Sequence, residues 1–505
     1  MNNNIDTTTE KLEDNELHAI RREKLQALKL SGNDPYYQTK FVRNSDSKEL
    51  KEKFDFLNGK TVRIAGRVMS KRIMGKAAFS HILDDFGQVQ LYFKSDILGE
   101  SYEAYKKLDI GDIIGASGRV FLTQKGEISV EIAEFVLLAK SLLPLPEKWH
   151  GLTDNDLRYR QRYVDLIANP EVKQSFVVRS KIIKAVRNCL DKRGFVEVET
   201  PILSTIAGGA AARPFTTHHN TLDLSMYLRV APELYLKRLI IGGFDKVYEI
   251  GKMFRNEGMS TRHNPEFTMM EAYSAYDDLY DMMTLTEKIF GAIRKELKVK
   301  SIINYQEHQI NLKSHFLRMS MSSAVKKYSD IDFLQCSDVS SILLELQNKG
   351  LMLDKNTSWG NALYAAFEHF VEHNLIQPTF ITDYPIEISP LAKKKLGDDR
   401  LTERFELFVA GREMGNAYTE LNDPIDQAER FKTQEEMRQR GDEEAQPYDL
   451  DFLTALEYGM PPTGGLGIGI DRLVMLFTNS NSIRDVLLFP TMKPIKNNVE
   501  SLLRN

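Results

Sequence analysis

The stretch Lys252–Tyr273, KMFRNEGMSTRHNPEFTMMEAY, guides our interpretation of the fold, because it combines alternating segments with dense charge of both signs. VYEIGKMFR, which ends at Arg255, alternates like a strand, NEGMSTRHNPE carries turn residues, and FTMMEAY alternates again. The pattern predicts a strand, a long loop and a second strand.

Charged side chains gather around this predicted loop. Arg255 and Glu257 close the first strand, and Arg262 and His263 lie in the loop. Alternation places an aromatic ring, a carboxylate and a phenol on one face of the second strand, with Phe267, Met269, Glu271 and Tyr273. An exposed hairpin with mixed surface charge is the alternative, but two similar clusters elsewhere favour a site.

The second cluster is RFELFVAGREMGNAYTELNDP, Arg404–Pro424. If Ala410 and Gly411 form a two-residue turn, Phe408 pairs with Glu413 and Glu406 with Gly415, so both carboxylates share one face. Two carboxylates without His or Cys ligands suit magnesium, which in turn suggests a nucleoside triphosphate.

A bulge decides where the rest of this second strand points. Asn416, Tyr418 and Glu420 face away from the two carboxylates unless the pairing slips by one residue. Gly415 is where a bulge could produce that slip.

The third cluster, TGGLGIGIDRLVML, runs small residues into a helix start with Arg472 in its first turn. Bare glycines let a flat ligand approach the backbone, and an arginine there can meet phosphate. GxxxxGK[ST] and GxGxxG are both absent, so a P-loop or Rossmann site has no support, and neither HExxH nor GxSxG occurs.

The region before residue 146 has a different period. Five short strands are expected between Thr61 and Leu138, TVRIAGRVMS, AAFSHILDD, GQVQLYF, DIIGASGRVFLTQ and EISVEIAEFVLL. In the third strand Val89, Leu91 and Phe93 predict a core face, and in the fifth Glu127, Ser129 and Glu131 predict a polar face. Such a barrel is typical of oligonucleotide-binding folds.

We therefore expect an α+β protein with three parts. Residues 1–58 form a polar lead, expected to be disordered to about residue 14, and an amphipathic helix at Glu16–Leu30. Residues 59–145 form the barrel, and residues 146–505 a larger domain with a helical insertion at about 283–375. SLLPLPEKWHGL is the expected linker, and Val172–Asp191 a helix followed by the strand FVEVETPIL.

Composition sets broad limits. The chain has 505 residues, a net charge of -4 and only two cysteines, Cys189 and Cys336, which disfavours a zinc module or a disulfide scaffold. No apolar signal core or membrane-length apolar run occurs, so we expect a cytoplasmic protein without membrane partners.

Three stretches resemble the signature motifs of the class II aminoacyl-tRNA synthetases: the helix and strand that end at Pro201, FRNE with the distal RHNPEFTMMEAY, and GLGIGIDR. The N-terminal barrel points to subclass IIb, which holds the aspartyl, asparaginyl and lysyl enzymes. GGAAARPFTTHHNTLDLSMYLRVAPELYLKRLIIGG, RHNPEFTMMEAY and PTGGLGIGIDR closely resemble bacterial lysyl enzymes. The resemblance implies an OB-fold anticodon-binding barrel, an antiparallel catalytic sheet flanked by helices, a homodimer whose interface includes Pro201, and ATP bound with Mg²⁺.

The resemblance also implies a role for individual residues. Arg255 and Arg472 would be catalytic, and the nucleotide would contact Arg255, Glu257, His263, Asn264, Phe267, Glu271 and Arg472. The magnesium ligands would be Glu406 and Glu413. Lysine would be bound by Gly209, Glu233, Arg255, Tyr273, Asn416, Tyr418 and Glu420. The anticodon would be read by Arg72, Phe79, Gln90 and Glu127.

The implied reaction is ATP-dependent activation of L-lysine to lysyl-adenylate, followed by transfer to the terminal adenosine of tRNA(Lys). An aspartyl or asparaginyl enzyme is the nearest alternative, although those enzymes would be expected to place a basic residue where Glu420 stands. A non-catalytic RNA-binding or regulatory protein, and an enzyme that adds lysine-like groups to a protein, are further alternatives. The first would tolerate loss of Arg255 or Arg472, and the second would lack the barrel.

Overall fold

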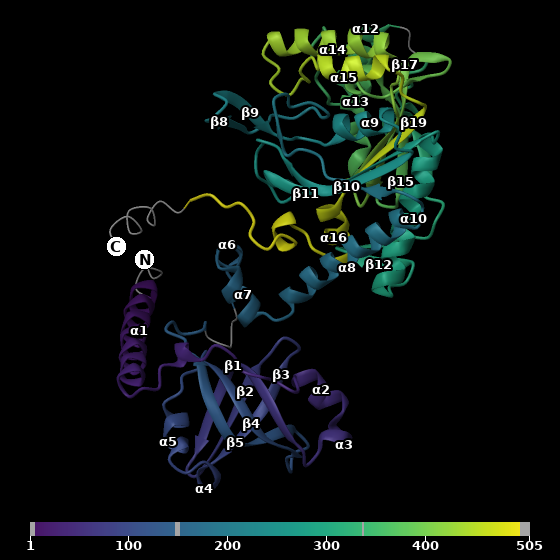
Figure 1. Ribbon diagram of the computed structural model, residues 1–505. Helices are drawn as coiled ribbons and strands as arrows, with labels where there is room; N and C mark the ends of the chain where they lie inside the picture. The colour runs from purple at the N-terminus through teal and green to yellow at the C-terminus, as the bar shows by residue number, and fades with distance from the viewer. Residues whose placement is uncertain (1–5, 147–151, 336–337, 495–505) are drawn as a thin grey trace. The chain divides into compact units, whose positions relative to one another are not determined.

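The alternating segments predicted between Thr61 and Leu138 form five strands that close into a barrel (Figure 1). The structure is a computed structural model that describes residues 6–146, 152–335 and 338–494. It comprises two units, Met1–Pro170 and Glu171–Asn505. The first unit holds β1 (Thr61–Met74), β2 (Ala77–Leu83), β3 (Gln88–Lys94), β4 (Ile113–Leu122) and β5 (Ile128–Ala139), in the order β1-β2-β3-β5-β4 around the barrel.

The barrel core follows the predicted alternation. Val89, Leu91 and Phe93 are buried, whereas Gln90 is only partly buried. Ser129, predicted on the polar face, is instead fully buried, and its hydroxyl donates to Gln90 Oε1 at 2.8 Å, which offsets the cost of burying it. The short helices of this unit are η1 (Pro35–Tyr37), α2 (Ser47–Glu52), α3 (Phe54–Leu57), α4 (Ser95–Leu98), α5 (Ser101–Lys106), α6 (Asn155–Arg160) and α7 (Arg162–Ala168).

The first helix, α1 (Asp6–Leu30), begins ten residues before the predicted start at Glu16. The prediction of a disordered lead is therefore wrong for residues 6–14, since Glu, Lys and Leu are good helix formers even in a polar segment. Arg21 ties α1 to the rest of the unit by donating to the carbonyls of Ser141 and Leu143 at 3.0 and 2.9 Å. Residues 147–151 of the expected linker lie outside the described residues.

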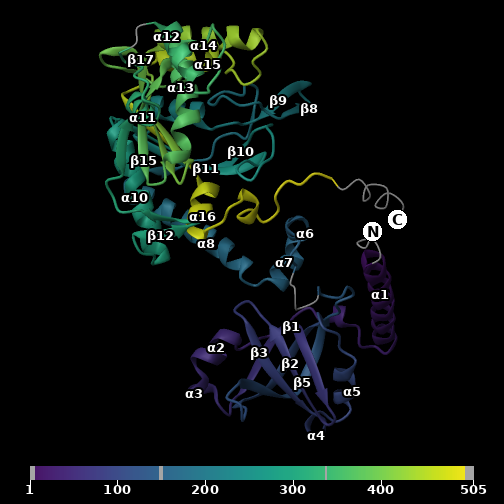
Figure 2. The same ribbon diagram turned by 180° about the vertical axis from the view of Figure 1, so that it is seen from behind.

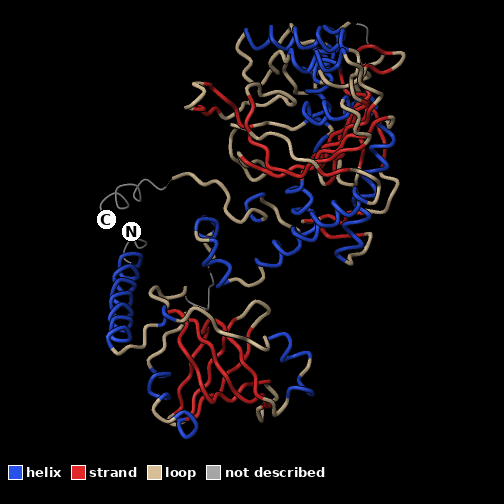
Figure 3. The backbone as a smooth tube through the Cα atoms, viewed as in Figure 1, coloured by secondary structure: helices blue, strands red, loops and turns tan. Residues whose placement is uncertain are grey.

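The second unit is built on a nine-stranded, mostly antiparallel sheet (Figure 3). Its order is β14-β15-β17-β18-β19-β11-β10-β6, with β16 paired to β17. These strands are β6 (Val196–Glu197), β10 (Lys246–Phe254), β11 (Glu266–Ala275), β14 (Leu317–Ser320), β15 (Thr379–Pro385), β16 (Lys394–Lys395), β17 (Asp398–Val409), β18 (Arg412–Thr419) and β19 (Thr463–Gly469).

Helices cover one face of this sheet. The largest core joins α8 (Val172–Asp191), α10 (Leu279–Leu297) and α16 (Ile470–Thr478) to inward residues of the strands. Figures 1 and 2 place α8 and α16 side by side at one end of the unit. The other helices are α9 (Glu233–Ile241), α11 (Met321–Ser329), α12 (Val339–Asn348), α13 (Trp359–Phe370), η2 (Glu372–Asn374), η3 (Ile386–Ile388), α14 (Pro424–Gln439), α15 (Leu450–Glu457) and η4 (Ile483–Asp485).

Two segments differ in detail from the expected pattern. The strand expected at FVEVETPIL is reduced to β6, because Pro201 has no N–H for a sheet ladder and Thr200 N donates instead to Glu249 Oε2 at 3.1 Å. The region 283–375 holds helices but also the hairpin of β12 (Ile302–Tyr305) and β13 (His308–Asn311), and β14 pairs with β15 in the main sheet.

The remaining strands form a small sheet in the order β7-β9-β8, with β7 (Leu203–Ser204), β8 (Thr216–His219) and β9 (Leu224–Leu228). Cys189 is buried and free, whereas Cys336 lies outside the described residues. Within the described ranges, no helix combines the length and apolarity needed to cross a bilayer.

Candidate active site

The face of the large sheet opposite α8, α10 and α16 carries a cavity of about 420 Å³. Because side chains alternate along each strand, successive residues face either the helix-covered core or the cavity. Along β17, Phe405, Leu407 and Val409 join the helix-covered core, whereas Arg404 and Glu406 line the cavity. The long loop predicted between two strands is confirmed, since β10 pairs with β11 antiparallel and Arg255 N donates to Pro265 O at 2.8 Å.

Three glycines of β19 form the floor of the cavity. Gly465, Gly467 and Gly469 stand opposite Tyr273, Glu271 and Met269 of β11, so their spacing by two places all three on the cavity face. A Cβ on Gly465 would lie 2.6 Å from Tyr273 Cε1, and would also collide with Glu420 Oε1. The GxGxG pattern therefore keeps the backbone bare where polar side chains converge.

The turn and bulge predicted in the second cluster are both present. Ala410 and Gly411 have positive φ angles of 52° and 65°, and Phe408 pairs with Glu413 as expected. The register then shifts, so that Leu407 pairs with Gly415 and Glu406 with Asn416. The extra residue is Met414, one position before the predicted site, and the slip brings Asn416 and Tyr418 to the cavity beside the two carboxylates.

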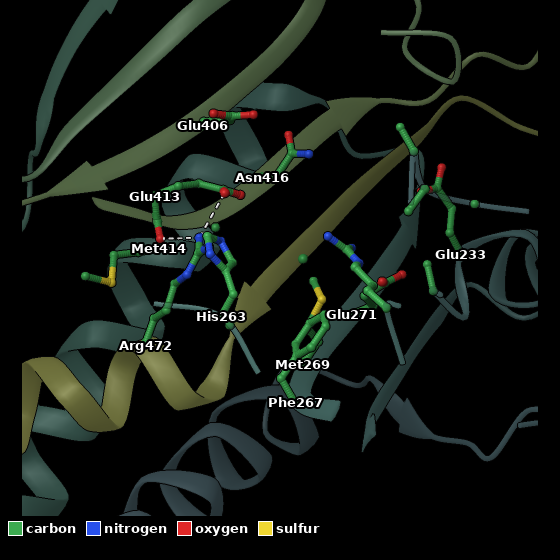
Figure 4. Close-up of a pocket in the computed structure, with 18 of the residues that line it drawn as sticks. Glu233, His263, Phe267, Met269, Glu271, Glu406, Glu413, Met414, Asn416 and Arg472 are labelled. Carbon is green, nitrogen blue, oxygen red and sulfur yellow. Dashed lines mark hydrogen bonds and ion pairs between the residues drawn. The ribbon is translucent and has the colours of Figure 1, made fainter. Parts of the chain in front are cut away.

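One end of the cavity pairs carboxylates with arginines (Figure 4). Arg472 Nη1 donates to Glu413 Oε2 at 2.9 Å and to the Glu413 carbonyl at 2.7 Å. Arg404 Nη2 donates to Glu406 Oε1 at 2.6 Å, and the Tyr384 hydroxyl donates to Glu406 Oε2 at 2.9 Å. Arg472 comes from the first turn of α16, as predicted from the third cluster.

The two carboxylates differ in their electrostatic environment. Burial, and then the negative charge of Glu413, raise the pKa of Glu406 to about 7. Burial alone would raise the pKa of Glu413 as well, but Arg472 beside it lowers that pKa below its ordinary value. Like charges confined together in this way are stabilised by a cation.

The middle of the cavity offers a guanidinium beside an aromatic face. Arg255 lies 5.2 Å from the centroid of the Phe267 ring, and its Nε is buried without a hydrogen-bond partner. His263, from the loop, has its pKa lowered by burial and then by the positive charge of Arg472. Asp471 fixes this region because its Oδ2 accepts from Thr268 N at 2.7 Å.

The opposite end is acidic. Glu233 opens α9 and lines the cavity, and Tyr273 Oη donates to Glu271 Oε2 at 3.0 Å. Burial, with the charge of Glu233, raises the pKa of Glu271 to about 8. Glu420 is fully buried behind Tyr273 and Gly465, and it lies 2.5 Å from the ammonium of Lys237.

The barrel carries a separate polar and aromatic surface. Arg72 pairs with Phe79 across β1 and β2, and Phe79 stacks on Tyr92 with ring centroids 4.6 Å apart. Beside this row, Gln90 Nε2 donates to Glu127 Oε2 at 2.7 Å, and His81 lies 2.9 Å from Glu127 Oε1. The four residues predicted to read an anticodon therefore lie close together, three on β1, β2 and β3 and Glu127 just before β5.

Comparison with known proteins identifies the family. A family model described as "tRNA synthetases class II (D, K and N)" matches residues 154–493, and an "OB-fold nucleic acid binding domain" matches residues 62–138. The chain belongs to the class II tRNA synthetases of this D, K and N group. The synthetase family model begins at residue 154, whereas the second structural unit begins at Glu171. The matched region therefore includes α6 and α7, which belong to the first unit.

Several curated relatives of this synthetase cover nearly the whole chain. A lysine–tRNA ligase of Carboxydothermus hydrogenoformans is 56% identical over 95% of this chain and 98% of its own length. The lysine–tRNA ligase of Pelotomaculum thermopropionicum is 57% identical over 95% of both chains. That of a Thermoanaerobacter species is 55% identical over 98% of this chain and 99% of its own.

The synthetase cavity gathers nearly all of the residues predicted for it. Glu420 alone among them does not line it, being enclosed behind the wall, and Pro201 lies elsewhere, exposed between β6 and β7. The residues in the cavity are Gly209, Glu233, Arg255, Glu257, His263, Asn264, Phe267, Glu271, Tyr273, Glu406, Glu413, Asn416, Tyr418 and Arg472.

Sequence reasoning missed three charged residues of the synthetase site. Arg404 shares a strand face with Glu406, and the i, i+2 spacing could have revealed it. Asp471 precedes Arg472 and could have been suspected as a first-turn acid. Lys237 is four residues from Glu233 on α9, a spacing that predicts an ion pair.

Glu406 and Glu413 fit a divalent cation as oxygen donors. After burial, the negative charge of Glu413 is the next cause of the raised pKa of Glu406, and a cation between the two carboxylates would relieve that repulsion. No cluster of three or more potential metal-ligating side chains occurs among the residues with described positions. A cation here would therefore need further ligands from a nucleotide or from water.

Proposed function

We propose that this protein is a lysine–tRNA ligase. It activates L-lysine with ATP and transfers the lysyl group to tRNA(Lys). The observation that carries the choice of lysine is the acidic end of the cavity, where Glu233, Glu271 and Glu420 converge with Tyr273. The 55–57% identity to lysine–tRNA ligases over at least 95% of the chain supports the same choice.

In the first step, a carboxylate oxygen of lysine attacks the α-phosphorus of ATP. A P–O bond forms to give lysyl-adenylate, the bond to the β-phosphate oxygen breaks, and pyrophosphate leaves with its electron pair. No protein base is needed because the nucleophile is already an anion. Arg255, with its unpaired Nε, holds the α-phosphate and the lysine carboxylate together, and Arg472 holds the γ-phosphate.

The nucleotide is held by the loop and β11. The adenine ring stacks on Phe267, with Glu257, His263, Asn264 and Glu271 near the nucleotide. Glu406 and Glu413 would hold Mg²⁺, which would neutralise phosphate charge during the displacement.

Lysine lies along the acidic end. Gly209 and Glu233 take the α-ammonium, Asn416 the carboxylate, and Tyr418 covers the aliphatic stem. Tyr273 and Glu420 take the ε-ammonium. A lysine ammonium withdrawn from water needs such charged acceptors, each worth about 1.5–3 kcal/mol.

In the second step, a ribose hydroxyl oxygen of the terminal adenosine of tRNA attacks the lysyl carbonyl. The ester bond forms, AMP leaves, and the hydroxyl proton is released. Arg72, Phe79, Gln90 and Glu127 on the barrel read the anticodon. The proposal includes a homodimer with Pro201 at the interface and a cytoplasmic location.

Amino-acid-dependent exchange of labelled pyrophosphate into ATP tests this assignment. We expect exchange with lysine, and none with aspartate or asparagine, because an acidic or neutral side chain leaves buried carboxylates unpaired. Exchange with aspartate or asparagine alone would overturn the choice of lysine. A folded protein that supports no exchange with any of the three would favour a non-catalytic role.

A further inference from the structure

A lysine of the protein itself lies behind the acidic end of the cavity. Lys237 is fully buried, and its Nζ lies 2.6 Å from Glu233 Oε1 and 2.5 Å from Glu420 Oε2. These two carboxylates come from different elements, α9 and the segment after β18. They are also the two that the proposed function assigns to the ammonium groups of the substrate.

The groups that face this ammonium come from several elements. Glu233 contributes from α9 and Glu420 from the segment after β18, and these two carboxylates in turn lie near Glu271 and Tyr273 of β11. The ring of Phe452 in α15 lies 5.9 Å from the Lys237 Nζ. Among described residues near the acidic end, Lys237 is the cation that directly contacts both Glu233 and Glu420.

The geometry leaves accepting capacity on Glu420. Although the Lys237 ammonium is close, neither carboxylate oxygen of Glu420 accepts a hydrogen bond of regular geometry. Burial raises the pKa of Glu420 to about 8, and Lys237 opposes that rise. A carboxylate this buried would favour its neutral form without a neighbouring cation, and a neutral acid binds an ammonium poorly.

We propose that Lys237 is a positioning residue for the amino-acid subsite: its ammonium bridges Glu233 and Glu420, aligns both carboxylates for the two ammonium groups of lysine, and favours the charged form of Glu420. The inference rests on the proposed function and adds a residue to it. Lys237 does not line the cavity, so it acts through the two carboxylates. It differs from a purely structural ion pair because its removal alters how lysine affinity depends on pH.

The test is isothermal titration of lysine into the full-length wild type, Lys237→Met and Lys237→Arg, from pH 6 to pH 9, with ATP titrated separately. We expect Lys237→Met to bind lysine roughly 10- to 100-fold more weakly than the wild type at neutral pH. This is the loss expected when the lysine ammonium loses one charged hydrogen-bonding partner, here the charged form of Glu420. ATP affinity should be unchanged. Lysine binding by Lys237→Met should recover as the pH rises above the pKa of Glu420, because Glu420 is then charged even without the Lys237 ammonium.

Lys140→Met is the matched control. Lys140 is also buried and also bridges two carboxylates, Asp109 at 2.5 Å and Asp112 at 2.9 Å, but it belongs to the barrel unit. It should lose thermal stability without weakening lysine binding. Lys237→Arg keeps the positive charge and should retain the wild-type pH dependence of lysine affinity. This variant keeps the proposal testable if Lys237→Met does not fold.

A double-mutant cycle shows whether Lys237 acts through Glu420. Lys237→Met should weaken lysine binding much less in a Glu420→Gln background than in the wild type. Equal losses in both backgrounds, an unshifted pH profile, or wild-type lysine affinity in Lys237→Met would each overturn the proposal. A wild-type protein that binds no lysine would refute the proposed function itself, and that result is read from the same titrations.

Discussion

The bare strand β19 gives the sharpest steric prediction. In Gly465→Ala, the new Cβ would lie 2.6 Å from Tyr273 Cε1. This is about 1 Å inside the ~3.5–4.0 Å separation of carbon atoms at optimal contact. Tyr273 and Glu420 are buried and cannot retreat into solvent. Backbone strain does not contribute to this clash, because Gly465 does not have a positive φ angle.

The expected size of the effect on lysine kinetics follows from the cost of overpacking a buried site. Such insertions cost about 1–3 kcal/mol, which corresponds to roughly a 5- to 150-fold fall in kcat/KM for lysine if the strain displaces Tyr273 and Glu420. Affinity for ATP should remain near the wild-type value, because Arg472 and Glu413 hold the other end of the cavity. The assay is pyrophosphate exchange at varied lysine, combined with direct titration of ATP.

Gly291→Ala is the matched control for this substitution. Gly291 lies in α10, where a Cβ would meet no atom within 4 Å. Alanine is a better helix former than glycine by about 0.8–1.0 kcal/mol, so this variant should be slightly more stable with unchanged lysine kinetics. Wild-type kcat/KM for lysine in Gly465→Ala, or an equal loss of ATP affinity, would refute the proposed placement of lysine.

Two further predictions concern the metal end and the barrel. Because the folded-state pKa of Glu406 is about 7, above the ordinary value of 4.5, its contribution to stability is full at low pH and is lost as the pH rises through 7. The charged form then becomes available, so Mg²⁺ affinity in the presence of ATP should rise by up to about tenfold per unit below pH 7. Glu406→Gln should abolish this rise, and an unchanged pH slope in titrations of that variant would argue against the metal assignment. Phe79→Ala should spare pyrophosphate exchange but weaken tRNA binding by the ~1–3 kcal/mol of one base stack, seen as a raised KM for tRNA, whereas Phe86→Ala, at an exposed ring in the same barrel, should leave that KM unchanged. Loss of exchange in Phe79→Ala would contradict the division of labour between the two units.

Local chemistry made much of the second cluster predictable. Ala410 and Gly411 form the expected turn, and the pairing of Phe408 with Glu413 follows from it. The bulge could be anticipated but was misplaced by one residue, because glycine marks where the backbone can deform and Met414 carries the extra residue. Alternation then fixed which side chains face the cavity.

Other features depend on contacts between distant parts of the chain. The burial of Glu420 behind Tyr273 and its approach to Lys237 join residues 183 positions apart, which no local pattern encodes. The short β6 reflects a competing hydrogen bond from Thr200 to Glu249. The early start of α1 was missed because polar composition was interpreted as disorder, although the same residues favour helix.

The most direct test of the proposed function is charging of a mixed tRNA pool with labelled lysine, aspartate and asparagine by the purified full-length protein, followed by identification of the charged tRNA. We expect only lysine to be esterified, and only to tRNA with a lysine anticodon. Charging with aspartate or asparagine in place of lysine, or no charging by a folded protein that binds ATP, would contradict it.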